Sequence, residues 1–178
     1  MSKSDNVIFI ILKIFAWIIF VGLSIESGGL IVNFIYSIFK PEVVSKLYNK
    51  LDLSEMYEKS TTAFYMMYSF ILAISLLKSV MFYIVIMLVT KLDMSIPFNG
   101  YVSRKILQIS YFTFTIGLLI YLAKESSKHL SKRGFDVSMI NQFWGDSSAF
   151  ILMGAVIYMI ALIFKKGIEL QNENDLTV

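Results

Sequence analysis

Four apolar runs, each long enough as a helix to cross a lipid bilayer, constrain this chain more than any other feature. They cover residues 7–39, 61–90, 106–123 and 147–164, and the segments between them hold nearly all the charge. A helix needs about 20 apolar residues to cross a hydrocarbon core of about 30 Å. Because 57% of the 178 residues are hydrophobic and 16% are charged, little remains for a soluble domain. The sequence predicts one all-α domain, an integral membrane four-helix bundle, followed by a polar tail over residues 165–178.

The first run is too long for one perpendicular crossing. A helix of this length reaches about 50 Å at 1.5 Å per residue. It also exceeds the apolar core of a signal peptide, about 7 to 15 residues, so we interpret it as retained. Two alternatives remain open: a straight helix that projects beyond the lipid, or a break at Ser27–Gly28–Gly29, since glycines weaken helix interiors.

A small and polar seam follows one face of this first helix. Counting by threes and fours from Glu26 gives Gly22, Gly29 and Asn33. Small residues let backbones approach closely in a membrane, and polar side chains hydrogen-bond across helices. We expect this face to pack against other helices, with Glu26 and Asn33 as intramembrane polar candidates.

Glu26 and Lys78 are the charged residues deep within the spans, whereas Lys13 lies near the membrane edge. Each costs about 2.5 to 3.5 kcal/mol near the bilayer centre. From the face that both helices share, Glu26 lies about 28 Å deep and Lys78 about 18 Å deep. One interpretation is an interhelical ion pair; the other is a protonated or hydrated Glu26 and a Lys78 that reaches the interface with its long stem.

The connection between the first two spans has apolar residues at helical spacing. These are Val43, Val44, Leu47 and Leu51, set among lysines and acids. The pattern predicts an amphipathic helix, either one that binds lipid or a partner or one that caps the bundle.

The connection after the third span is basic and then aromatic. It contains Phe135, Ile140, Phe143 and Trp144. Aromatic residues at the end of a span are typical of a membrane-interface belt, which is our prediction for them.

No residue pattern indicates catalysis, a metal or a cofactor. The chain has no cysteine and one histidine, His129, so thiolate sites, histidine clusters and a Ser-His-Asp triad lack members. Basic residues are spread over short loops and mixed with acids, which argues against direct nucleic-acid binding. We expect no enzymatic activity.

The third span begins with a helix cap and a basic turn. Asn99 is a good N-cap, and Arg104 and Lys105 follow at the membrane face. Glu169 and Asp175 emerge at the same face. Either the tail folds back and docks on this basic turn, or it is a solvated tail, since exposed ion pairs contribute little.

Two stretches, "IPFNGYVSRKILQISYF" and "IFKKGIELQNENDLTV", resemble the small bacterial four-span membrane proteins catalogued as domain of unknown function 2975. The resemblance is best over residues 96–178, and this chain has Gly100 and Tyr101 where the family frequently has acidic residues. It implies a bacterial cytoplasmic (inner) membrane, both termini in the cytoplasm, and neighbouring genes for small helix-turn-helix regulators. It implies no enzymatic activity.

Two functions follow from these observations. The first is a non-enzymatic sensor, anchor or accessory protein in the lipid bilayer, whose tail side contacts a cytoplasmic regulator or another membrane protein. The second is a small transporter or channel component organised around Glu26 and Lys78. That second function implies a homo-oligomer, because four helices enclose little space alone. Charge does not decide the orientation, since the basic residues are divided almost evenly between the two faces.

Overall fold

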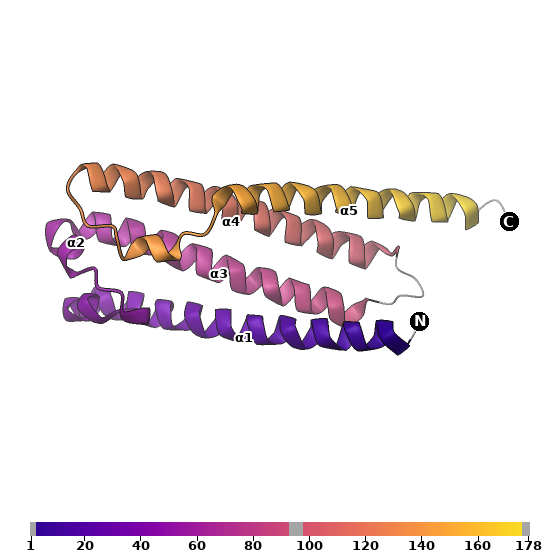
Figure 1. Cartoon of the computed structure of the whole chain (residues 1–178), viewed down its shortest axis with the longest axis horizontal. Coiled ribbons are helices and arrows are strands. Elements are labelled where there is room, and N and C mark those ends of the chain that lie inside the picture. The colour runs from indigo at the N-terminus through magenta and orange to yellow at the C-terminus, as the bar shows by residue number, and fades with distance from the viewer. Residues whose placement is uncertain (1–2, 93–97, 176–178) are drawn as a thin grey trace.

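The computed structural model describes residues 3–92 and 98–175, and it is helical almost throughout (Figure 1). The four long helices are α1 (Lys3–Phe39), α3 (Thr61–Lys91), α4 (Gly100–Lys132) and α5 (Ser147–Asp175). All four are long and apolar enough to cross a membrane. The predicted all-α architecture with four spans is confirmed. Helices α4 and α5 run well past the predicted ends of their spans, to Lys132 and Asp175.

Helix α1 is continuous, so of the two alternatives the structure has the unbroken helix. The break at Ser27–Gly28–Gly29 does not occur. A continuous helix satisfies its own backbone groups, whereas a break at membrane depth would leave them to find partners elsewhere. The Ser27 hydroxyl also donates to the carbonyl of Ser24, 3.2 Å away, which is compatible with helical backbone.

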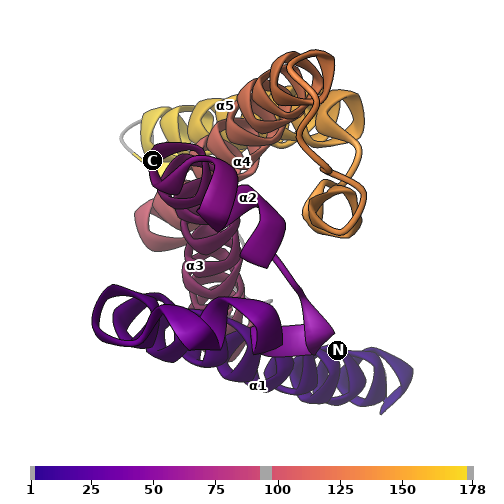
Figure 2. The ribbon, with the colours of Figure 1, turned by 90° about the vertical axis from the view of Figure 1, so that its left-hand side faces the viewer.

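The spans contact one another in chain order. Helix α1 packs on α3, α3 on α4, and α4 on α5, and the described residues form no comparable interface between α1 and either α4 or α5. Seen end-on, α1 lies at one edge, α3 in the middle and the α4/α5 pair at the other edge (Figure 2). The bundle is therefore an open row, and many large apolar side chains of α1 and α5 remain exposed.

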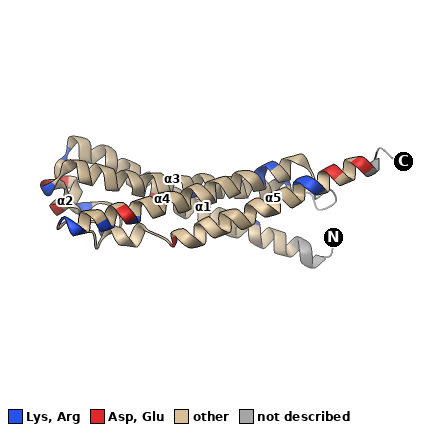
Figure 3. Ribbon diagram, turned by 90° about the horizontal axis from the view of Figure 1, so that it is seen from above, with Lys and Arg blue, Asp and Glu red and all other residues tan. Residues whose placement is uncertain are grey.

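Charged residues gather at the two ends of the molecule and leave an almost uncharged band between them (Figure 3). Helix α1 begins, and α5 ends, at the same end (Figure 1). This is what an even number of spans requires, and the uncharged band is what a bilayer core requires.

The connection after α1 is not the single amphipathic helix that its spacing predicts. It forms two 3₁₀ turns, η1 (Pro41–Lys46) and η2 (Tyr48–Lys50), and a short helix α2 (Ser54–Lys59). Asn49 and Lys50 adopt left-handed backbone angles, with φ of 58° and 59°, which a regular helix does not contain. The apolar periodicity is still meaningful, because Val44, Leu47 and Leu51 are buried in the core and Val43 packs against it.

The aromatic connection after α4 also turns inward. A 3₁₀ turn, η3 (Ile140–Phe143), places Ile140 and Trp144 in the same core as the first connection, while Phe135 and Phe143 pack against it. The interface-belt prediction is wrong for Ile140 and Trp144, which are 0% and 8% exposed. Sequence position places them at the end of a span, but the connection folds inward and contributes both side chains to a core that includes residues of α3 and α4.

Glycines permit a close helix contact between α4 and α5. A Cβ on Gly154 would lie 2.9 Å from the Phe114 backbone nitrogen, and one on Gly117 would lie 2.9 Å from the Ile151 nitrogen. The Ser110 hydroxyl donates to the Gly154 carbonyl at 2.9 Å. Small residues of this kind permit backbone approach between membrane helices.

Candidate functional site

The polar residues of α1 are positioned by a seven-residue repeat that faces α3. Phe20, Ser27 and Phe34 share this face. Phe20 meets Tyr83 with ring centroids 5.8 Å apart, and Phe34 stacks on Tyr68 at 5.7 Å. Between them, the Ser27 and Ser79 hydroxyls are hydrogen-bonded at 3.2 Å. The interface with α3 therefore runs through Ser27, not through the predicted seam at Glu26, which is offset by one residue, or about 100° around the helix.

The Ser27–Ser79 bond places Glu26 and Lys78 at nearly the same level, although their estimated depths differed by about 10 Å. When two right-handed helices run antiparallel and one residue of each is in contact, the residue just before each of them points to the same side of that contact. Glu26 and Lys78 thus flank the serine contact on one side of the row. Both are partly buried, and they form no ion pair with one another or with any other described residue.

The predicted seam is covered at one point by the first connection. The Tyr48 ring lies over Gly29, where a Cβ would come within 2.6 Å of Tyr48 Cδ2. About two turns nearer the start of α1, a Cβ on Gly22 would meet nothing within 4 Å. Glu26 and Asn33 are half-buried, and neither side chain has a hydrogen-bond partner in the described part of the chain. The seam is thus open to a partner from outside the monomer.

The turn before α4 is tied to the end of α5 by an aromatic contact. Phe98 stacks near Phe164, with ring centroids 5.2 Å apart, and a Cβ on Gly167 would lie 2.7 Å from Phe98 Cδ1. Helix α5 passes through Gly167 without ending, so much of the predicted polar tail over residues 165–178 continues the helix. The absence of a side chain at Gly167 makes room for Phe98.

The charged residues near this contact take local partners. Lys166 pairs with Glu169 at 3.0 Å, and Lys105 donates to Gln108 at 2.9 Å while lying 5.8 Å from the centroid of Tyr101. The predicted cap is confirmed, since Asn99 Oδ1 accepts from the backbone N–H groups of Tyr101 and Val102. Arg104 is exposed. Docking of the tail stays a prediction, because the side chain of Asp175 and residues 176–178 lie outside the described residues.

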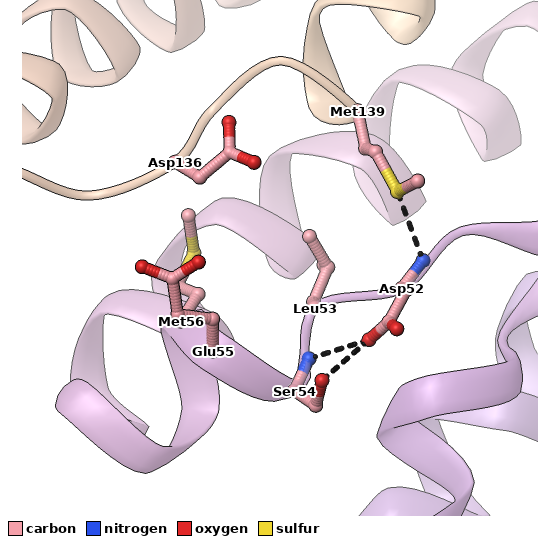
Figure 4. A pocket seen from close by; sticks show the side chains of 7 residues that line it. All are labelled: Asp52, Leu53, Ser54, Glu55, Met56, Asp136 and Met139. Atoms are coloured by element: carbon pink, nitrogen blue, oxygen red, sulfur yellow. Dashed lines mark hydrogen bonds between the residues drawn. The ribbon is translucent and has the colours of Figure 1, made fainter.

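A pocket of about 210 Å³ at the opposite end brings the two connections together (Figure 4). Asp52 Oδ1 accepts from the hydroxyl and the N–H of Ser54, and the Asp52 N–H donates to the Met139 sulfur at 3.4 Å. The bonds from Ser54 lower the pKa of Asp52 below its ordinary value. Sequence reasoning missed this contact, because residues 52 and 139 are far apart in the chain and each is unremarkable alone.

The described residues hold no group of three or more His, Asp or Glu side chains that could bind a metal ion. The polar groups that geometry does bring together are of two kinds: the partly buried Glu26 and Lys78 inside the row, and charged or hydrogen-bonding groups at its ends. Such groups can orient a neighbour or bind an ion.

Four apolar helices, an uncharged middle band and charged ends define the class: this is an integral membrane protein with four transmembrane helices. A model of the family described as Protein of unknown function (DUF2975) matches residues 49–178, and the chain belongs to that family. The match confirms the resemblance and extends it back from residue 96 to residue 49, across all of α3. No curated protein matches the chain, and no solved structure matches it. Helix α1, with Glu26, precedes the matched region.

Proposed function

We propose that the protein is a non-enzymatic accessory protein of the bacterial inner membrane that receives a transmembrane helix of another membrane protein on α1. One observation carries the proposal: the seam of α1 is uncovered beside Gly22, and Glu26 on it has no partner within the described chain. A charged residue at membrane depth is costly unless it is paired. The partner helix would therefore present a basic or hydrogen-bond-donating side chain to Glu26.

Exposure of α1 supports the same proposal. Only 6% of its most apolar stretch is buried, against 33% for the corresponding stretches of α3 and α4. A row with a free edge helix can accept a neighbouring helix without rearranging its own interfaces, because α1 packs against α3 through a different face.

The test is photocrosslinking in native membranes. A benzophenone amino acid at Ile19 lies on the seam side of α1, and one at Val21 lies about 200° around the helix as a matched control; both positions are exposed. We expect protein adducts from position 19 that Glu26→Leu abolishes, and lipid adducts from position 21. Lipid adducts alone from position 19 would overturn the proposal.

The end that carries the start of α1 and the end of α5 would then face the cytoplasm and offer the tail to a cytoplasmic regulator. The absence of cysteine makes this simple to test. Single cysteines replacing Lys46 and Asn172, at opposite ends, are treated with a membrane-impermeant maleimide in intact cells. Labelling at 46 alone is expected; labelling at 172 alone would reverse the orientation.

A transporter or channel component is the second candidate, favoured by Glu26 and Lys78 lying level and on the same side. It requires several copies, so the crosslinked product at position 19 would have twice the mass of the 20.4 kDa chain. Proteoliposomes would then show ion or proton flux that Glu26→Gln abolishes. Flux that is unchanged by this substitution would exclude the candidate.

A further inference from the structure

A groove at the far end of α4 is separate from the α1 seam and from the pocket lined by Asp52 and Met139. The α4 residues that line it are Lys124, Ser127, Lys128, Ser131 and Lys132, spaced so that they share one face of the helix. The connection after α4 supplies the opposite wall through Val137, Asn141 and Trp144. The volume is about 650 Å³, far more than one water molecule occupies.

The charge of the groove is positive. Of its three lysines, Lys128 pairs with Glu125 at 2.6 Å, and Glu125 lies outside the lining. Lys124 and Lys132 form no ion pair with any residue that the structure describes. An anion that enters the groove would meet two uncompensated ammonium groups.

The hydrogen-bonding groups of the groove are mostly donors. The Ser127 hydroxyl donates to Asn141 Oδ1 at 3.5 Å, which leaves the Asn141 amide N–H groups for another acceptor. Trp144 is 92% buried, and its indole N–H has no acceptor within the described part of the chain. A buried donor without a partner has lost its hydrogen bonds to water without replacement, so an oxygen-rich ligand here would satisfy a group that the protein leaves unsatisfied.

We propose that this groove binds a phosphate group, either as a free ion or as the headgroup of an anionic phospholipid. Phosphate offers several acceptor oxygens to the lysines, the Asn141 amide and the indole N–H together. The groove also lies at the end of a membrane span, where lipid headgroups are found, and lysines at the membrane surface are attracted to anionic lipids.

Tryptophan fluorescence offers a direct test on the full chain. The sequence has two tryptophans, so Trp17→Phe leaves Trp144 as the sole indole reporter, on the wall of the groove itself. The protein is placed in nanodiscs of neutral phosphatidylcholine and titrated with inorganic phosphate. In a second arm, the nanodiscs contain a rising fraction of phosphatidylglycerol.

A saturable change in Trp144 emission is expected in one arm, and the arm that responds identifies the source of the phosphate. We expect Lys124→Gln with Lys132→Gln to weaken the response at least tenfold. The matched control, Lys46→Gln with Lys50→Gln, removes the same charge from exposed residues of the first connection and should leave it unchanged. Substituting arginine at 124 and 132 should retain binding.

The salt dependence of binding, measured on the protein with all of its lysines, provides a second measurement that does not depend on whether the lysine variants fold. Binding to uncompensated lysines weakens as ionic strength rises. The proposal is overturned by no saturable response in either arm, by a response indifferent to salt, or by equal weakening in the control pair.

Discussion

The α4/α5 pair and the α1/α3 pair solve the same packing problem differently. In α4/α5, Gly117 and Gly154 lie so close to the backbone and side chains of the opposite helix that a Cβ would have no room. In α1/α3, the contact consists of aromatic stacking, a hydrogen bond between the Ser27 and Ser79 hydroxyls, and one that the Tyr68 hydroxyl donates to the Leu30 carbonyl. The first pair has an interface that fixes two helices against each other. The second holds an edge helix by one face and leaves the rest of that helix for another contact.

The largest effect should come from adding one methyl group to the tight pair. Gly154→Ala places a Cβ 2.9 Å from backbone that cannot move aside, so we expect a loss of about 2 to 3 kcal/mol. Gly22→Ala on α1 meets open space, and it should gain up to about 1 kcal/mol from helix propensity. Unfolding in detergent micelles measures both. Effects of the same sign would contradict the comparison.

A smaller loss is expected where α1 is held by a buried hydroxyl. Tyr68 is fully buried and donates to the Leu30 carbonyl at 3.0 Å. Tyr68→Phe keeps the ring but removes this bond, at a cost of about 1 kcal/mol. Tyr65→Phe, which removes a longer bond of 3.3 Å from a partly exposed residue, serves as the control and should cost less. A larger loss from Tyr65→Phe would show that the buried bond does not hold α1.

The Ser27–Ser79 bond should be detectable as a coupling. A double-mutant cycle of Ser27→Ala and Ser79→Ala is expected to give an interaction free energy of about 0.6 kcal/mol, a typical value for hydrogen bonds between membrane helices. Ser27→Ala combined with Ser110→Ala, on the other helix pair, should be additive. A coupling near zero in the first cycle would mean that aromatic packing alone positions α1.

The smallest effect concerns the contact between the two connections, one after α1 and one after α4, through Asp52 and Met139. Hydrogen bonds from Ser54 lower the pKa of Asp52, so ionised Asp52 stabilises the fold above its ordinary pKa of 3.8, and this stabilisation is lost as pH falls through the lower folded value. Asp52→Asn should flatten the pH dependence of stability in that acid range, so its loss relative to the wild type is present at pH 7 and disappears as the wild-type carboxyl is protonated. Asp52 is exposed, so solvent limits the effect. A wild-type protein that gains stability relative to Asp52→Asn on acidification would contradict the sign.

Local patterns in the sequence were reliable where a single element decides the outcome. The spans, the Asn99 cap and the apolar face of the first connection follow from hydrophobicity, capping chemistry and periodicity, and the structure has all three. The predicted polar tail over residues 165–178 begins inside α5, because the helix passes through Gly167. Whether it does so depends on the neighbour, here Phe98, which needs the space.

The candidate site was found only in part for the same reason. Glu26 and Lys78 stand out in sequence because charges are rare in spans, but their relative level and side depend on the offset between α1 and α3. The seven-residue repeat of Phe20, Ser27 and Phe34 marks the face of α1 that contacts α3, whereas the prediction from Glu26 chose the neighbouring face. The sequence does not predict the phosphate groove, because its walls come from α4 and from a connection whose aromatic residues were expected to face the lipid interface.

The sequence by itself determined that this chain crosses a membrane four times with its two ends on one side, because burying apolar residues in lipid depends on each segment alone. Only the tertiary structure decided that the spans form an open row, that α1 turns Ser27 and not Glu26 toward α3, and that Trp144 is buried. Those outcomes depend on how helices fit together, through close backbone approach and pairing of side chains that are distant in the chain. Such contacts are properties of pairs of segments, which no single stretch of sequence contains.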